Sequence, residues 1–189
     1  TPYLRVFPRQ VVLAPNESQT VKVQFRRSST MEDGEYRSHL YFRAEKNNNP
    51  LGEQNNAKDS ISISVKLEAV FGISIATIIK KGTSTTLSKI TDLNYVKDDN
   101  SNHILNFTIN RSGNMSTYGD IAINYVSKEN IIYEVAKVKG IAVYTPGNLR
   151  RVKMLLNKPE GINFNGGKFN VVYTKNESAE ILAEAVLNF

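Results

Sequence analysis

A stretch of alternating side chains constrains the fold more than any other feature of the sequence. It runs from Ser60 to Ile73, and branched aliphatic residues occupy every second position of its first part: Ile61, Ile63, Val65 and Leu67. Because successive side chains of a strand point to opposite faces, these four residues form one apolar row. A polar, asparagine-rich segment (46–59) precedes the stretch, and a second β-rich block follows it directly. The stretch is therefore predicted to be the last strand of one domain, leading into another.

The remaining sequence predicts an all-β protein. Branched and aromatic residues alternate with polar ones throughout, and no segment of helical length keeps a 3.6-residue apolar period. The length of 189 residues and the apolar fraction of 40% suit two domains, predicted at 1–76 and 77–189. The first block contains strand candidates at 3–7, 20–26 and 36–44. The second contains seven, as an immunoglobulin-like sandwich requires: 87–96, 103–109, 121–126, 131–143, 151–156, 168–173 and 179–187.

A repeat of short motifs within the chain suggests that the two blocks are copies of one sandwich. Leu13-Ala14-Pro15 precedes one strand, and Tyr144-Thr145-Pro146 precedes another at an offset of 131 residues. Gly34 and Gly166 stand before the next strands at an offset of 132 residues. On this repeat the first copy is short by roughly 55 residues, so we expect a truncated first domain without its first three strands. Half its core would lie open unless another chain or a rearranged strand covered it.

The composition excludes several classes of function for this chain. The net charge of +6 arises from 24 basic and 18 acidic residues, and no basic run exceeds two residues. No basic run is interleaved with aromatics in an RNA-binding signature, so we expect no nucleic-acid partner. The chain has no cysteine, which excludes thiolate zinc sites, thiol catalysis and disulfides. Its most apolar run, 69–79, is far shorter than the ~20 residues that a membrane span needs.

No catalytic constellation is present. The chain has no HExxH motif, nucleophile elbow or phosphate loop, and its two histidines, His39 and His103, sit in different predicted domains. Asp98-Asp99-Asn100 lacks the spacing of a calcium loop and indicates a turn. We therefore expect a protein that is not an enzyme and that has no cofactor and no metal site.

In order and spacing, several short motifs resemble the periplasmic pilus-assembly chaperones, the PapD-like superfamily of two immunoglobulin-like domains. The resemblance is to a divergent, chaperone-like branch with the amino-terminal part missing. The motifs are Leu13-Ala14-Pro15 with Val21-Lys22-Val23, Asp33-Gly34-Glu35 leading into Leu40-Tyr41-Phe42-Arg43, the alternating row Ile61 to Leu67, Leu105-Asn106-Phe107-Thr108-Ile109-Asn110 with Tyr118, Tyr144-Thr145-Pro146 with Val152, and Asn165-Gly166-Gly167.

The resemblance implies a mechanism of binding. In that family the last strand of the first domain fills the groove of an incomplete, immunoglobulin-like pilus or surface subunit, by donor-strand addition. By position Ile61, Ile63, Val65 and Leu67 would be the donated residues. The partners implied are such subunits and an outer-membrane usher, and the implied location is the periplasm. Exposed strand edges would also permit self-association.

At other positions this sequence departs from the pattern of the family. The arginine that anchors the subunit carboxylate falls in the missing region, and the anchoring lysine aligns with Phe71 or a neighbour. In the interdomain salt bridge, Glu35 corresponds to the family glutamate, Ile75 is the best match to the arginine, and Phe164 aligns with the acidic partner. Anchoring by charge and the interdomain bridge are therefore both in question.

A second interpretation uses the same residues. The aliphatic row also suits the core-facing side of an ordinary buried strand. In that case the chain is a structural or adhesive tandem immunoglobulin-like module of a cell surface, without chaperone activity. Whether the four side chains lie at an edge or beneath the sheet distinguishes the two interpretations.

Overall fold

The computed structural model describes residues 3–45 and 69–189, and every regular element in them is a β-strand. The prediction of an all-β protein is confirmed for this part of the chain. The four residues of the predicted donor row, Ile61, Ile63, Val65 and Leu67, lie outside the described residues. The chain divides into two compact units. Unit 1 comprises residues 1–27 and 36–79, and unit 2 comprises residues 28–35 and 80–189.

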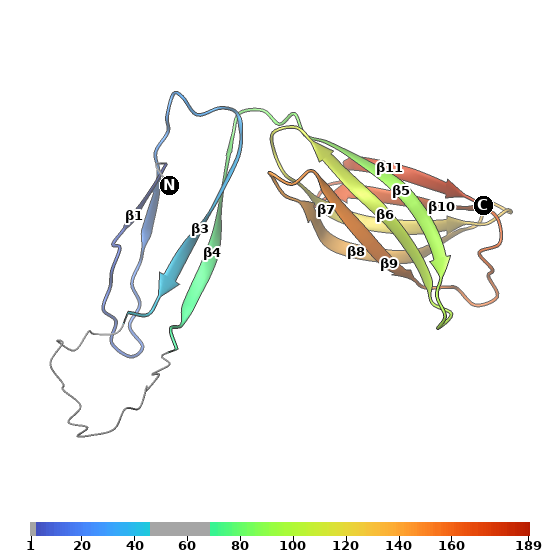
Figure 1. The fold of residues 1–189 in the computed structure, drawn as a ribbon, viewed down its shortest axis with the longest axis horizontal. Helices are drawn as coiled ribbons and strands as arrows, with labels where there is room; N and C mark the ends of the chain where they lie inside the picture. Colours follow the sequence, from blue (N-terminus) through green and yellow to red (C-terminus); the bar gives the residue numbers. More distant parts are fainter. Residues whose placement is uncertain (1–2, 46–68) are drawn as a thin grey trace, which may run out of the picture. The chain divides into compact units, whose positions relative to one another are not determined.

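Unit 2 contains two antiparallel sheets (Figure 1). The first has the order β5-β6-β9, formed by Leu87–Lys97, His103–Ser112 and Leu149–Leu156. The second has the order β11-β10-β7-β8, formed by Ile181–Asn188, Lys168–Lys175, Thr117–Val126 and Ile132–Val143. Each of the seven strands predicted for this block has a counterpart here, with ends that shift by a few residues. Strand ends are set by turn chemistry and are less marked in the sequence than the apolar alternation.

The core of unit 2 follows from that alternation. In β7, Ile121, Ile123 and Tyr125 are buried while the residues between them are more exposed. Their partners across the ladder in β10 are Tyr173, Val171 and Phe169, which are also fully buried. The other sheet contributes Leu105, Phe107 and Ile109 of β6 to the same cluster. Each such side chain contributes about 1.5–3 kcal/mol by leaving water, so this cluster is the main stabilising feature of unit 2.

The described strands of unit 1 form two two-stranded sheets. One pairs β1 (Leu4–Phe7) with β2 (Lys22–Phe25) in antiparallel register, and the other pairs β3 (Gly34–Arg43) with β4 (Gly72–Lys81). Strands were predicted at the places of β1, β2 and β3. Only Gly72 and Ile73 of β4 fall within the strand predicted from Ser60 to Ile73, and no strand was predicted over residues 74–81. Residues 69–71 belong to no strand, and β4 begins at Gly72. A Cβ atom at Gly72 would lie 2.6 Å from the Tyr41 hydroxyl, so a residue without a side chain suits this start of the pairing.

Unit 1 lacks a core in its described part. None of its described residues is buried, in contrast to the many buried side chains of unit 2. Its large apolar residues include some of the most exposed among the residues that the structure describes, such as Val12 at 92% and Phe71 at 79%. The apolar surface of these strands therefore stays available for contact with another segment or another molecule.

Segment 28–35 belongs to unit 2, although the residues on both sides of it belong to unit 1. Met31 of this segment is only 3% exposed. Its backbone carbonyl accepts a hydrogen bond from Lys81 Nζ, and the same ammonium group lies 3.7 Å from Asp33 Oδ1. Unit 2 is therefore assembled from two separate stretches of the sequence.

Candidate functional site

The first part of the candidate site is an exposed aliphatic surface on β4 and the residues just before it. Ile73 is 68% exposed and Ile75 is 51% exposed, and Phe71 precedes them with the same two-residue spacing. We call Phe71, Ile73 and Ile75 the β4 row. In the sequence they continue the odd-numbered positions of the predicted donor row. Exposed apolar side chains in such a group mark interaction surfaces more often than scattered single ones do.

The partner strand adds aromatic surface to this sheet. Tyr41 and Phe42 of β3 are 62% and 40% exposed. The backbone N–H of Ala44 donates to the carbonyl of Phe71 at 2.9 Å, which continues the β3-β4 pairing past the start of β4. Among the described residues this sheet has two strands only. Its outer edges carry backbone donors and acceptors of the kind that pair with an added strand.

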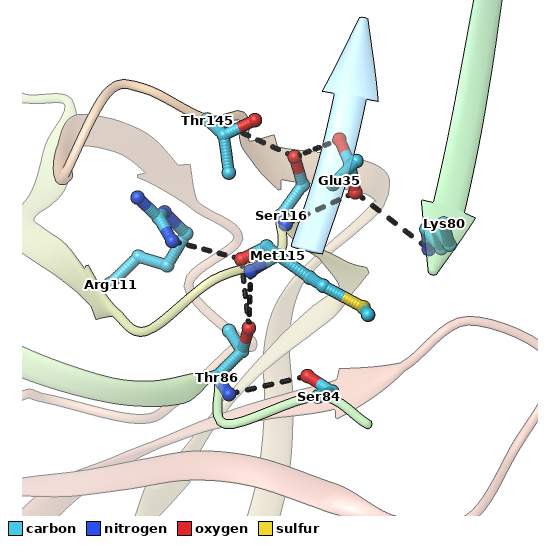
Figure 2. Close-up of polar contacts among 8 residues, drawn as sticks. All are labelled: Glu35, Lys80, Ser84, Thr86, Arg111, Met115, Ser116 and Thr145. Carbon is cyan, nitrogen blue, oxygen red and sulfur yellow. Dashed lines mark hydrogen bonds and ion pairs between the residues drawn. The ribbon is translucent and has the colours of Figure 1, made fainter. Parts of the chain in front are cut away.

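The second part of the site is a buried carboxylate at the start of β3. The Glu35 side chain is 1% exposed. Its Oε2 accepts a hydrogen bond from the Ser116 backbone N–H at 3.1 Å, and its Oε1 accepts one from the Ser116 hydroxyl (Figure 2). The Ser116 hydroxyl oxygen in turn accepts the backbone N–H of Thr145 at 3.0 Å. Lys80 Nζ lies 3.9 Å from Glu35 Oε2, but its side chain is 60% exposed. A distant, solvated ammonium stabilises less than the two direct hydrogen bonds.

Arg111 at the end of β6 and Asn114 of the β6-β7 connection hold the loop that carries Ser116. Arg111 is 8% exposed and donates to the backbone carbonyls of Gly147, Gly113 and Met115 at 2.7–2.9 Å. Asn114 donates through Nδ2 to the carbonyls of Asp33 and Thr83, and its Oδ1 accepts the Thr85 N–H. The Glu35 backbone N–H also donates to the Asn114 carbonyl at 3.0 Å. The first residues of β3 are thus fixed to unit 2 by backbone and side-chain contacts together.

The connection also needs a residue without a side chain. Gly113 has a φ of +89°, and a Cβ atom there would lie 2.4 Å from the Thr85 carbonyl oxygen. That conformation is costly for residues with a side chain, and the close approach is to backbone that cannot move aside easily. The glycine therefore lets the loop pass next to the segment before β5.

The structure places the residues of the aligned salt bridge in different surroundings. Glu35 contacts Ser116, one residue before β7, and Ile75 is half exposed on β4. Phe164 is 4% exposed and its ring packs against the ring of Tyr125, near the other end of β7. Ser116 and Tyr125 are nine residues apart, which corresponds to about 30 Å along a strand. Phe164 therefore lies far from the Glu35 carboxylate, within the aromatic part of the core.

The two histidines differ in environment. His39 is exposed on β3. The His103 ring stacks on Tyr95, its Nδ1 is 2.5 Å from the Tyr95 hydroxyl, and the Phe164 ring packs edge-on against it. Desolvation lowers the pKa of His103 below the usual 6.5, and the positive charges of Lys158 and Lys97 lower it further. Within residues 3–45 and 69–189, no three acidic or histidine side chains gather as a metal site would need.

Sequence reasoning missed most of the polar site. Segment 110–114 was interpreted only as the separation between the strands predicted at 103–109 and 121–126, although residues 110–112 belong to β6. Nothing in its composition indicated that Arg111 and Asn114 would organise a buried carboxylate. Glu35 was noted only through the family resemblance. The one local signal was the accumulation of polar residues with a glycine between two strongly apolar strands. No helix in the described part of the chain has the length and apolar character to cross a bilayer.

Comparison with known proteins does not assign a family. No family model matches the chain, and no curated protein matches it. Among solved structures, DesR, a β-glucosidase from Streptomyces venezuelae, is 13% identical with a TM-score of 0.38, over 57% of this chain and 15% of that chain. β-Glucosidase 3B from Thermotoga neapolitana is 15% identical with a TM-score of 0.38, over 57% of this chain and 16% of that chain.

A further solved structure is the DNA-bound alkylpurine DNA glycosylase AlkC from Pseudomonas fluorescens. It is 17% identical with a TM-score of 0.30, over 53% of this chain and 30% of that chain. This chain therefore spans less than a third of the length of each of these enzymes. These likenesses are too distant to bear on what the chain does.

Proposed function

We propose that this chain is a non-enzymatic, chaperone-like protein of the periplasm that binds exported fimbrial or surface subunits by β-strand addition. The observation that carries the proposal is the exposed β4 row in a unit whose described part has no buried residue. Exposed apolar surface on a strand is an aggregation hazard unless a binding partner covers it. A client with an unfilled apolar groove would cover such a row and gain a strand.

The proposed architecture is two immunoglobulin-like domains, and the strand order of unit 2 supports it. In chain order its first, second and fifth strands form one sheet, and its third, sixth and seventh lie together in the other. That division corresponds to the A-B-E and C-F-G groups of an immunoglobulin-like sandwich. The fourth strand, β8, pairs with β7 and so extends the second sheet, as an added C′ strand does.

The resemblance to the pilus-assembly chaperones supplies the donated residues. On this proposal Ile61, Ile63, Val65 and Leu67 enter the client's groove, and the β4 row continues the contact toward unit 2. The client is then held by apolar side chains and backbone pairing. Glu35 does not take part in client binding, because its carboxylate is occupied by Ser116.

The test uses two double variants and a pull-down with candidate subunits from periplasmic extract. Ile73→Glu with Ile75→Glu changes side chains that are more than half exposed, so we expect an unchanged melting temperature and loss of client binding. Ile63→Glu with Val65→Glu tests the donor row in the same way. The matched control is Leu155→Glu, a 64% exposed residue of β9 in unit 2, which should leave binding intact.

The competing function is a structural or adhesive tandem module without chaperone activity. It predicts that Ile63→Glu with Val65→Glu unfolds unit 1, because the row would then be core. A folded variant that still captures the client would exclude strand donation by this row. An unfolded variant would favour the structural module instead.

A further inference from the structure

A second surface of unit 1 lies on the β1-β2 hairpin. Arg5 is directly opposite Gln24, and Phe7 is directly opposite Lys22. Residues that face each other in an antiparallel pair project on the same side of the sheet. Arg5, Phe7, Lys22 and Gln24 therefore share one face, while Leu4, Val6, Val23 and Phe25 share the other. We call the first of these the cationic face.

The cationic face borders a hollow. Its volume is about 910 Å³, and it is lined by Arg5, Phe7, Lys22 and Gln24 of the cationic face, by Arg9, and by Val6 and Val23 of the opposite face. Phe7 is 74% exposed and gives the hollow an aromatic surface among the charged groups. A second hollow of about 300 Å³ shares Val6 and Arg9 with the first and extends to Tyr41 and Phe42 of β3. The surface thus combines cations with apolar contact area.

The charge of this region is one-sided. Residues 3–27 carry five cationic side chains and one acidic side chain, Glu17. The Glu17 carboxylate accepts the backbone N–H of Ala14. In the described residues no carboxylate lies within ion-pair distance of Arg5, Arg9 or Lys22, although ion pairs occur elsewhere in the same part of the chain. Three neighbouring cations without counter-charges attract an anionic partner and repel a cationic one.

We propose that the cationic face binds an extended, acidic segment of a partner protein. Arg5 on β1 and Lys22 on β2 are diagonal neighbours on this face, because Lys22 is opposite Phe7, and such positions lie about 7–8 Å apart. Acidic residues at every second position of an extended segment, about 6.6 Å apart, therefore come close to both cations. Within the described residues β1 and β2 pair only with each other, so backbone groups are available along the hairpin. Apolar residues of the segment contact Phe7.

This partner differs from the client of the β4 row in chemistry, because it is recognised by charge. An anionic membrane would use the cations alone, and a single-stranded nucleic acid would use the cations and stack bases on Phe7, but neither would pair with the backbone groups at the edges of the β1-β2 sheet. An acidic extended polypeptide uses the cations, the Phe7 ring and these backbone groups, and the cationic face is assigned to it for that reason.

The experiment titrates the 189-residue chain with fluorescent probes at 50 mM salt and follows anisotropy. The main probe is a seven-residue peptide that alternates glutamate and valine. Comparison probes are its lysine counterpart, a peptide of the same composition with its glutamates grouped at one end, a 20-nucleotide oligothymidylate and vesicles that contain phosphatidylglycerol. The test variant is Arg5→Gln, Arg9→Gln and Lys22→Gln together.

The matched control removes the same charge from unit 2 by Lys139→Gln, Arg151→Gln and Lys153→Gln, three exposed residues. We expect saturable binding of the alternating acidic peptide, at least tenfold weaker binding by the test variant, and unchanged binding by the control. All six residues are exposed, so both variants should keep the melting temperature of the parent chain.

Several results would overturn the proposal. The first is absence of binding of the alternating acidic peptide at millimolar concentration. The second is an equal loss of peptide affinity in the test and control variants, which would indicate diffuse charge attraction. Equal affinity for the peptide with grouped glutamates would show that the spacing of alternate residues in a strand does not contribute to recognition. Tighter binding of the oligonucleotide or the vesicles would assign the cationic face to a polyanion or a membrane.

Discussion

Ser116 donates both its backbone N–H and its hydroxyl to the carboxylate of Glu35, across 81 positions of sequence. The carboxylate is almost completely removed from water, with a side-chain exposure of 1%. A buried anion is tolerated only when hydrogen-bond donors surround it, and here the donors come from the residue just before β7. This pair fixes the point where the chain leaves unit 2 to form the rest of β3.

Replacement of Glu35 by Gln should destabilise unit 2. The amide keeps the shape of the carboxylate but turns a donor toward one of the two Ser116 donors, which leaves a buried group unsatisfied. We expect a loss of about 1–3 kcal/mol in the free energy of unfolding, measured by urea denaturation. Lys80→Gln is the matched comparison, because it removes the exposed ammonium at 3.9 Å, and should cost less than about 1 kcal/mol. A larger loss for Lys80→Gln than for Glu35→Gln would show that the ion pair dominates.

Replacement of Gly113 by Ala should be more costly than replacement of Gly161 by Ala. Both glycines have a positive φ, +89° and +74°, so both variants incur the backbone strain of about 1–2 kcal/mol. A Cβ atom at Gly161 meets nothing within 4 Å, whereas one at Gly113 would lie 2.4 Å from the Thr85 carbonyl oxygen. The difference between the two free energies of unfolding therefore isolates the steric contact in the β6-β7 connection. Equal losses in the free energy of unfolding would mean that the β6-β7 connection can shift to accommodate the added methyl group at no cost.

Acidification should weaken unit 2 through His103. Its pKa in the folded chain is lowered by desolvation and by Lys158 and Lys97, while Asp98 acts in the opposite direction. Between the folded pKa and the unfolded value near 6.5, the unfolded chain binds more protons. The stabilising contribution is therefore present above about pH 6.5 and is lost as the pH falls through the interval below it.

The measurement is the free energy of unfolding at pH 7.5 and at pH 5.5. His103→Gln should reduce the decrease between the two pH values, since the titrating group is gone. His39→Gln, a change at an exposed residue of β3, should leave the decrease as it is in the parent chain. The same decrease in the His103→Gln variant as in the parent would contradict the assignment.

The strands of unit 2 could be predicted from the sequence because one physical constraint repeats along them. Ile121, Ile123 and Tyr125 must all reach the same core, and a two-residue period is the only way a strand achieves this. The Glu35 site has no such period. Its donors come from Ser116, which lies between the strands predicted at 103–109 and 121–126, and the pairing of residues 81 positions apart is decided by tertiary packing.

Residues 28–35 show the same limit in the fold. The sequence around Asp33-Gly34 has the composition of a turn within the first block, and no local signal assigns it to unit 2. Its assignment follows from the burial of Met31 and from the hydrogen bonds that Lys81 and Asn114 donate to Met31 and Asp33, which are 50 and 81 positions away in the sequence. For β4, the strand predicted from Ser60 to Ile73 includes residues 69–71, which belong to no strand, and misses residues 74–81, which do.

The discontinuous make-up of unit 2 also affects how the chain can be divided and synthesised. A fragment that starts at Lys80 would retain all seven strands of β5 to β11 but would leave Ser116 without its acceptor. During synthesis on the ribosome, residues 28–35 emerge well before the sheets that receive them. Unit 2 is therefore complete only when this early-made peptide contacts loops that are synthesised about 80 residues later, and a fragment without it would expose the Ser116 donors to water.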